Sequence, residues 1–186
     1  VSTAVVILAG IPPTTIPRRI LLLQLRRIGD TLLGTPAIRA IAYAFPEAKI
    51  DFIAEYPANE ALIGNPYIDR LLVPKQHGIL ELLKFIRELR REKYDWAIDF
   101  MSNPRSAQFT FASGARFRYG LDRFGRRWAY NRRALETVSD LPKYAVDLRL
   151  DMLDLIGILS AGRHLEVFAD QTDKIESSRI ESLVGN

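Results

Sequence analysis

The sequence contains no cysteine and only two histidines, His77 and His164, which lie far apart. The absence of cysteine excludes disulfides and thiolate metal sites, and the two histidines have no metal-ligand spacing. Long apolar runs are also missing. The amino-terminal stretch "VSTAVVILAGI" is shorter than the roughly 20 apolar residues that span a bilayer. It also lacks the basic leader and cleavage site of a secretory signal.

Two common nucleotide-binding motifs are missing as well. No GxGxxG turn follows an apolar run, and no GxxxxGK[ST] loop occurs anywhere in the 186 residues. The sequence therefore predicts neither a dinucleotide site nor a P-loop.

Short apolar runs alternate along the chain with segments of helical periodicity. Strands are predicted over 19–25, 48–55, 68–74, 95–101 and 115–121, and helices over 31–45, 58–66, 78–94, 102–114 and 144–159. In the helix 78–94, one face carries Ile79, Leu82, Leu83, Ile86 and Leu89. This alternation predicts an α/β fold, a Rossmann-like, doubly wound and mostly parallel sheet.

The predicted domain occupies residues 18–162. Residues 1–17 are interpreted as an amino-terminal extension, either an extra strand or packed arm, or an arm in shallow contact with a membrane. A short strand and then a polar helix with few apolar residues are predicted within residues 165–186, in the carboxy-terminal segment 163–186. We expect this segment to form a linker and the start of a second domain.

Polar residues follow the first strand directly in the stretch "RRIGDTLLGTP". Ligands of parallel sheets bind beyond the carboxyl ends of the strands, so Arg26, Arg27 and Asp30 are candidate site residues. Gly29 permits a close backbone approach or a positive φ. Two interpretations of Asp30 stay open from the residues alone: a helix N-cap, for which Asp is favoured, or a catalytic carboxylate.

The stretch "ARFRYGLDRFGRRWAYNRR" (115–133) combines arginines with aromatic residues and one acid. Guanidinium groups bind phosphate and carboxylate bidentately, so this segment suits a polyanionic ligand. A solvated hairpin and a nucleic-acid surface are the alternatives. Its arginines are Arg116, Arg118, Arg123, Arg126, Arg127, Arg132 and Arg133.

An ordered series of segments resembles one enzyme family. "RRIGDTLLGTPAIRAI", "FPEAKIDFIAE", "NPYIDRLL", "YDWAIDF" and "GARFRYGLDRFGRR" resemble the amino-terminal half of the lipopolysaccharide heptosyltransferases, glycosyltransferase family 9. The resemblance covers roughly residues 18–180. The family motif, Gly-Asp followed by a proline, corresponds to Gly29-Asp30 and Thr35-Pro36. The amino-terminal extension before Arg18 is longer than we expect for a member of this family.

The resemblance implies half of a two-domain GT-B enzyme that transfers heptose from ADP-heptose onto the Kdo/heptose inner core of lipid A. It implies that Asp30 is the general base of an inverting reaction that needs neither a metal nor another cofactor. The implied site for the Kdo-lipid A acceptor comprises Arg26, Arg27, Gly29, Thr31, Arg116, Arg118, Arg123, Arg126 and Arg127. The donor would bind a missing carboxy-terminal domain, so the isolated fragment is expected to be inactive.

The implied location is the cytoplasm, at the inner face of the cytoplasmic membrane, and nucleic acid is not an expected partner. Two alternatives remain. One is a related GT-B transferase acting on another surface glycan. The other is a non-catalytic basic α/β module that binds nucleic acid or a phosphorylated partner.

Overall fold

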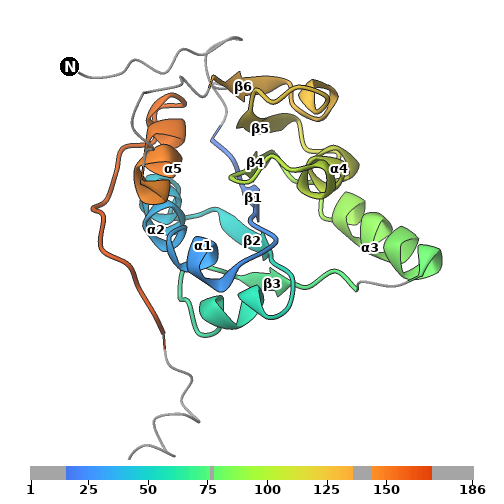
Figure 1. The fold of residues 1–186 in the computed structure, drawn as a ribbon, viewed down its shortest axis with the longest axis horizontal. Helices are drawn as coiled ribbons and strands as arrows, with labels where there is room; N and C mark the ends of the chain where they lie inside the picture. Colours follow the sequence, from blue (N-terminus) through green and yellow to red (C-terminus); the bar gives the residue numbers. More distant parts are fainter. Residues whose placement is uncertain (1–15, 76–77, 136–143, 169–186) are drawn as a thin grey trace, which may run out of the picture.

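The computed structural model describes residues 16–75, 78–135 and 144–168, which form a parallel sheet with helices on both faces (Figure 1). The strand order is β3-β2-β1-β4-β5-β6, which is the Rossmann order. The strands are β1 (Arg19–Leu23), β2 (Lys49–Ile53), β3 (Arg70–Leu72), β4 (Trp96–Asp99), β5 (Phe117–Leu121) and β6 (Arg132–Ala134). The predicted fold class is confirmed.

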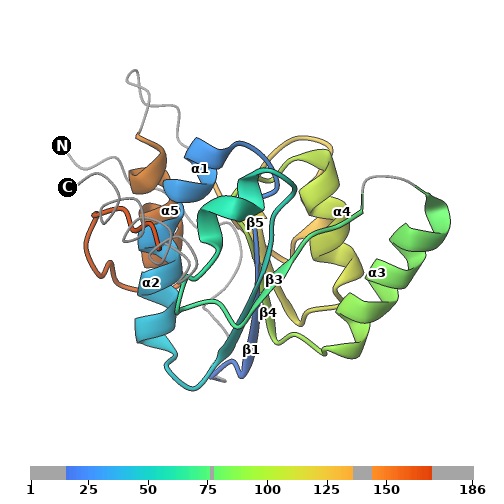
Figure 2. The same ribbon diagram turned by 90° about the horizontal axis from the view of Figure 1, so that it is seen from below.

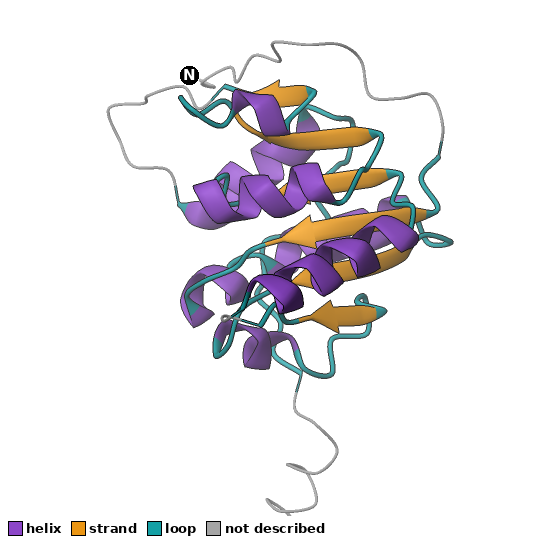
Figure 3. Cartoon of the chain, turned by 90° about the vertical axis from the view of Figure 1, so that its right-hand side faces the viewer, coloured by secondary structure: helices purple, strands orange, loops and turns teal. Residues whose placement is uncertain are grey.

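The helices form two layers (Figures 1 and 2). One side of the sheet carries α1 (Ile28–Leu32), α2 (Thr35–Ala44) and α5 (Ala145–Asp154), and the other carries α3 (Ile79–Arg91) and α4 (Pro104–Ala112). Two 3₁₀ helices, η1 (Ala58–Leu62) and η2 (Arg127–Ala129), complete the connections. Figure 3 shows the strands stacked side by side between these layers.

Strand β1 is apolar at nearly every position because both faces of the sheet are covered. Ile20 and Leu22 pack in the core shared with α2 and α5, whereas Leu21 and Leu23 pack in the core on the α3 and α4 side. All four are 0% exposed. The continuous apolar run of the sequence therefore alternates between two cores, as in other parallel sheets.

The helix predicted over 31–45 is in fact two helices. Helix α1 ends at Leu32, Gly34 is the N-cap of α2, and Pro36 lies in the first turn of α2. Proline has no N–H to donate to the carbonyl four residues earlier, and its ring clashes with that carbonyl. A continuous helix through Leu32 and Pro36 is therefore disfavoured, and the chain restarts at Thr35.

Helix α3 exists as predicted, but most of its apolar face is not buried. Only Leu89 is buried in α3. Ile79 is 73% exposed and Leu83 is 56% exposed, at the end of α3 that follows β3. The amphipathic pattern correctly predicted a helix, and the structure leaves most of its apolar face exposed.

The segment after β5 is a crossover connection and not a hairpin. Strand β6 pairs with β5 in parallel, with Tyr119 opposite Arg132, and η2 lies in the connection between them. A hairpin would pair antiparallel. The solvated-hairpin interpretation is therefore wrong. Strand β6 has no apolar run from which it could be predicted.

Several predictions for the chain ends lie outside the described residues. These are the strand or arm over most of 1–17 and the polar helix near the carboxyl end. Residues 159–168 contain neither helix nor strand. Within 16–75, 78–135 and 144–168, no helix combines the length and apolar character needed to cross a bilayer.

Gly120 in β5 gives a direct test of the packing near the carboxyl edge of the sheet. A Cβ at this position would lie 2.6 Å from Tyr130 Cε1 and 2.8 Å from Ser102 Oγ. Both neighbours are fixed, because Tyr130 donates to Asp99 and Ser102 Oγ accepts from the Leu121 amide. We expect Gly120→Ala to destabilise the protein by about 1–3 kcal/mol in urea unfolding.

Gly29→Ala is the matched control for this prediction. A Cβ at Gly29 would meet nothing within 4 Å, and alanine favours helix over glycine. We expect no loss of stability in this variant. Equal unfolding midpoints for both alanine variants would contradict the close packing around Gly120.

Candidate active site

Asp30 lies at the carboxyl edge of the sheet, where β1 leads into α1. It is the third residue of α1, whose N-cap is Arg27 and has no side-chain capping hydrogen bond. The N-cap interpretation of Asp30 is therefore wrong. The Asp30 side chain is half-buried, and among the described residues no group donates a hydrogen bond to its carboxylate. Its acceptor oxygens remain available to a ligand.

The backbone is strained immediately before this carboxylate. Arg27 has φ 67°, a conformation that L-residues other than glycine rarely adopt. Such residues cost of order 1–3 kcal/mol and cluster at functional sites. Gly29, where the sequence allowed a positive φ, has an ordinary φ. Its lack of a side chain instead leaves open space beside Asp30.

A buried arginine from α5 lies close to Asp30. Arg149 is 5% exposed, and its guanidinium reaches from α5 to the end of β1, where Nη2 donates to Gln24 Oε1 at 3.2 Å. Burial lowers the pKa of Arg149, and the nearby Asp30 carboxylate opposes this by raising it. The Nε atom of Arg149 is buried and has no hydrogen-bond partner. Arg149 therefore places a positive charge beneath the α1 turn.

A second carboxylate at the same edge, this one buried, joins two arginines. Glu55 follows β2 and is 3% exposed. Its Oε2 accepts from Arg26 Nε at 3.2 Å, and its Oε1 lies 2.9 Å from Arg105 Nε at the start of α4. Glu55 thus orients Arg26 and Arg105 across the ends of β1, β2 and β4. Sequence reasoning missed Glu55 and Arg105, although Glu55 ends the predicted strand 48–55 and Arg105 lies four residues after the predicted strand 95–101.

Thr31 is buried, and its side chain bonds to the protein backbone instead of facing solvent. It is 0% exposed, and its hydroxyl donates to the Arg27 carbonyl at 3.2 Å. Because Thr31 has no exposed surface in this structure, its side chain cannot make the predicted contact with an acceptor. The bond instead helps to hold Arg27 in its unusual conformation.

The basic segment does not form a single cluster. Arg116 and Arg118 lie at the amino end of β5, whereas Arg123, Arg126 and Arg127 follow its carboxyl end. A five-residue strand separates them by roughly 13 Å, at about 3.3 Å per residue. Arg116 and Arg118 therefore lie at the edge of the sheet opposite to Asp30, which corrects the single site expected from the sequence.

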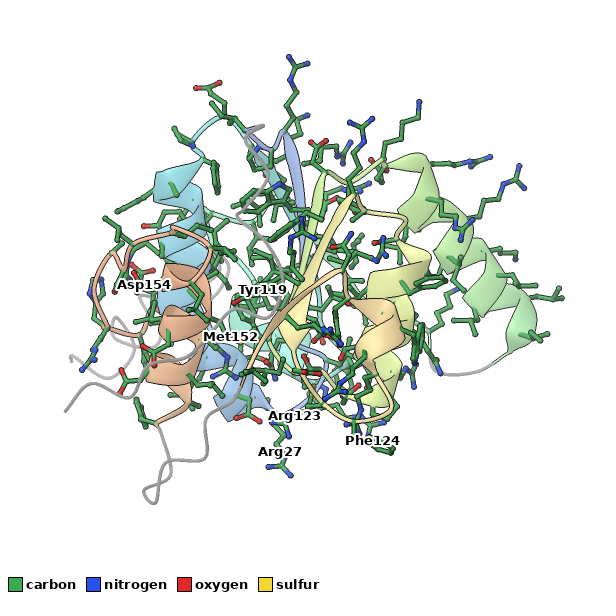
Figure 4. All side chains as sticks on the ribbon, turned by 90° about the horizontal axis from the view of Figure 1, so that it is seen from above. Arg27, Tyr119, Arg123, Phe124, Met152 and Asp154 are labelled. Carbon is green, nitrogen blue, oxygen red and sulfur yellow. The ribbon has the colours of Figure 1, made fainter. Side chains whose placement is uncertain are left out.

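Arg27, Arg123 and Phe124 lie at the same end of the molecule, as Figure 4 shows. Phe124 is 94% exposed. Nearby, Arg127 Nε pairs with Asp122 Oδ1 at 2.6 Å, and the Asp122 side chain is 1% exposed. The loop after β5 therefore presents an apolar ring flanked by guanidinium groups, with a buried carboxylate anchoring one of them.

Asp99, at the end of β4, is a buried carboxylate that fixes the neighbouring loop. It accepts hydrogen bonds from the amides of Met101 and Ser102 at 2.9 and 2.8 Å and from the Tyr130 hydroxyl at 2.7 Å. Burial raises the pKa of Asp99, although these hydrogen bonds oppose the shift. Because Asp99 is 0% exposed, it positions the start of α4 and Arg105 and does not meet a ligand.

Within the described part of the chain, no group of three or more His, Asp or Glu side chains could hold a metal ion. The independence from metals implied by the family resemblance stays a prediction. The candidate site therefore comprises the Asp30 carboxylate, the charge of Arg149, and a rim of arginines at the carboxyl edge.

Comparisons with known proteins identify relatives with this architecture. Residues 82–145 match the family model described as glycosyltransferase family 9 (heptosyltransferase). A Haemophilus influenzae protein, provisionally assigned as a glycosyltransferase, is 23% identical over 137 residues, covering 73% of this chain and 39% of that protein.

Solved structures share the fold over most of the chain. A family 9 glycosyl transferase from Veillonella parvula superposes with TM-score 0.72 and 22% identity, over 91% of this chain and 50% of that one. E. coli heptosyltransferase WaaC with ADP superposes with TM-score 0.62 and 22% identity, over 80% of this chain and 50% of that one. E. coli ADP-heptose lps heptosyltransferase II superposes with TM-score 0.60 and 20% identity, over 88% of this chain and 50% of that one.

The chain spans at most about half the length of these relatives. The match covers the segment from α3 to the start of α5, and the solved structures share the sheet and its flanking helices. The resemblance of this chain to the amino-terminal half of glycosyltransferase family 9 proteins is therefore confirmed.

Proposed function

We propose that this chain is the acceptor-binding half of a glycosyltransferase that transfers heptose from ADP-heptose onto the Kdo/heptose inner core of lipid A. The observation that carries the proposal is the position of Asp30. Its carboxylate stands at the carboxyl edge of the sheet, accepts no hydrogen bond from the described residues, and lies beside exposed arginines. The family match over residues 82–145 and the shared fold support the reaction class.

In the proposed reaction, Asp30 acts as general base. An acceptor hydroxyl attacks the anomeric carbon of the heptose from the face opposite ADP, and the bond to the ADP phosphate breaks. The hydroxyl becomes acidic as the new bond forms, and its proton passes to the Asp30 carboxylate. The anomeric centre is inverted. A carboxylate without competing hydrogen bonds is suited to receive that proton.

The arginine rim fits the anionic part of the acceptor. Arg27 is exposed at the turn before Asp30, and Arg126 lies in the loop after β5. Guanidinium groups bind phosphate and carboxylate oxygens bidentately. We propose that Arg26, Arg27, Arg123, Arg126 and Arg127 contact the phosphates and Kdo carboxylates of the acceptor.

Exposed apolar side chains at the same edge fit the lipid part of the acceptor. Phe124 is 94% exposed, and Ile79 and Leu80, at the start of α3, are 73% and 69% exposed. Each follows a strand at its carboxyl end. Apolar side chains beside basic ones are typical of surfaces that rest on anionic membranes. We propose a peripheral position on the inner face of the cytoplasmic membrane.

Calorimetric titration of this chain tests the acceptor assignment. We expect saturable binding of a soluble, deacylated Kdo–lipid A backbone and no binding of ADP-heptose, whose site we assign to the other half of the enzyme. The combined variant Arg27→Gln/Arg126→Gln should bind the backbone at least about tenfold more weakly, since a hydrogen bond to a charged group contributes about 1.5–3 kcal/mol. Its affinity should also depend less on salt.

Arg91→Gln is the control, because Arg91 is exposed at the last turn of α3, at the opposite edge of the sheet. It should bind like the unmodified chain. Equal affinity of the double variant would contradict the arginine assignment. Tight binding of a random oligonucleotide, with none of the backbone, would favour the basic-module alternative.

A further inference from the structure

A cavity of about 330 Å³ lies at the amino edge of the sheet, opposite to Asp30. The residues around it are the first residues of strands or those just before them. Arg18 precedes β1, Trp96 begins β4, Phe117 begins β5 and Arg132 begins β6. The cavity thus spans the ends of four strands, and the proposed transfer reaction makes no use of it.

The rim of this cavity is positively charged. Arg18, Arg116 and Arg132 line it, and within the described ranges none of the three pairs with a carboxylate. Asp95 also lines it, but its Oδ2 already accepts from the backbone amides of Arg18 and Arg19 at 2.8 and 3.1 Å. Three positive charges and one negative charge leave a local excess of two positive charges.

One of these arginines has an unmet hydrogen-bonding capacity. Arg132 Nη1 donates to the Asn131 carbonyl at 2.8 Å, whereas Arg132 Nε is buried and has no partner. Buried donors are normally satisfied by a hydrogen-bond partner. A guanidinium has five N–H donors, so Arg132 keeps donors for an anion in the cavity besides the one bonded to the Asn131 carbonyl.

The floor of the cavity is apolar. Trp96 and Phe117 are each 3% exposed, and their ring centroids lie 4.7 Å apart. Small-molecule sites combine an apolar lining with a few placed polar groups and begin at volumes of about 300 Å³. An apolar floor beneath a rim with two excess positive charges matches a dianion attached to a compact apolar body.

We propose that this cavity is a second ligand site, which binds a small phosphate monoester with an apolar or aromatic body. The phosphate would meet Arg116 and Arg132, and the apolar body would rest on Trp96 and Phe117. This proposal does not depend on the transferase assignment, because the two sites lie at opposite ends of the strands.

Tryptophan fluorescence gives a local readout of this site. The protein has two tryptophans, and Trp128→Phe leaves Trp96, in the cavity floor, as the only one. In this background we titrate phenyl phosphate, inorganic phosphate and phenol in parallel. We expect a saturable change in Trp96 emission with phenyl phosphate, and binding at least tenfold weaker for each of the other two.

The combined variant Arg116→Gln/Arg132→Gln, in the same background, should weaken phenyl phosphate binding at least tenfold. Arg91→Gln, an exposed arginine outside the cavity, should leave it unchanged. Urea unfolding of each variant verifies that the fold is retained. If Arg116→Gln/Arg132→Gln fails to fold, the single Arg116→Gln replaces it.

A linear, non-saturating response to phenyl phosphate would overturn the proposal. Equal affinity of phenol and phenyl phosphate, or of the arginine variant and its parent, would do the same. The arginine variant should still bind the deacylated lipid A backbone normally. Failure of one site is therefore distinguishable from failure of the other.

Discussion

Replacing Asp30 by asparagine is expected to lower the kcat of heptose transfer by about 10²–10⁴-fold, the usual contribution of a general base. The assay uses a complete enzyme in which this chain is joined to the nucleotide-sugar-binding half that the proposed function assigns to it. Asparagine has nearly the same shape as aspartate but cannot accept the proton of the attacking hydroxyl. Because the Asp30 carboxylate accepts no hydrogen bond from the described residues, its loss should leave the fold and the acceptor affinity almost unchanged.

Glu60→Gln is the matched control. Glu60 is an exposed carboxylate in η1, which packs beside α1 at the same edge of the sheet. We expect its kcat to stay within about twofold of the unmodified enzyme. Near-normal turnover of Asp30→Asn, measured with acceptor and ADP-heptose both saturating, would contradict the assignment of Asp30 as the base. If Glu60→Gln lowered kcat equally, the loss would come from removing any negative charge at this edge of the sheet and not from removing the base.

Much of the fold was predictable because its determinants are local. The β1 run is apolar at successive positions since both faces of the sheet are covered, and a segment of this kind is visible without any partner. Strand β6 was missed for the opposite reason. It has three residues, two of which are arginines, and only its pairing with β5 makes it a strand.

The candidate site was predictable only where it follows a strand directly. Asp30 stands in the turn after β1, so the rule for parallel sheets found it. Arg149 lies 119 positions later in α5 and reaches Asp30 only through the packing of α5 against α2. For the basic segment, closeness in sequence wrongly predicted closeness in space. Seven arginines are close in sequence, but β5 carries them to opposite edges of the sheet.

Replacing Asp51 by asparagine is expected to have the largest effect on stability. Asp51 is 1% exposed in β2. Its Oδ2 accepts from Arg70 Nη2 and the Tyr94 hydroxyl, both at 2.6 Å, and from Arg19 Nη2 at 3.2 Å. Breaking a fully buried ion pair costs about 3–5 kcal/mol. Arg19 and Arg70 are 29% and 37% exposed and keep Glu92 as a partner, so we expect a loss of about 3 kcal/mol, at the lower end of that range. Urea unfolding at pH 7 measures this loss.

Asp154→Asn is the control for Asp51. Asp154 is an exposed carboxylate at the end of α5 (Figure 4), and exposed substitutions usually change stability by less than about 0.5 kcal/mol. A loss in Asp51→Asn no larger than that of the control would contradict the proposed network.

The pH dependence of unfolding separates the charge of Asp51 from its packing. Burial raises the pKa of Asp51, but the hydrogen bonds from Arg70 and Tyr94 and the charges of Arg70 and Arg19 outweigh it, so the net pKa lies below its ordinary value of 3.8. A depressed pKa means that the folded state binds this proton less tightly than the unfolded state does. The stabilisation is therefore complete above pH 3.8 and is lost as the pH falls through the folded pKa. We expect this acid-dependent loss to be present in Asp154→Asn and absent in Asp51→Asn, since asparagine does not titrate and has no charge to lose.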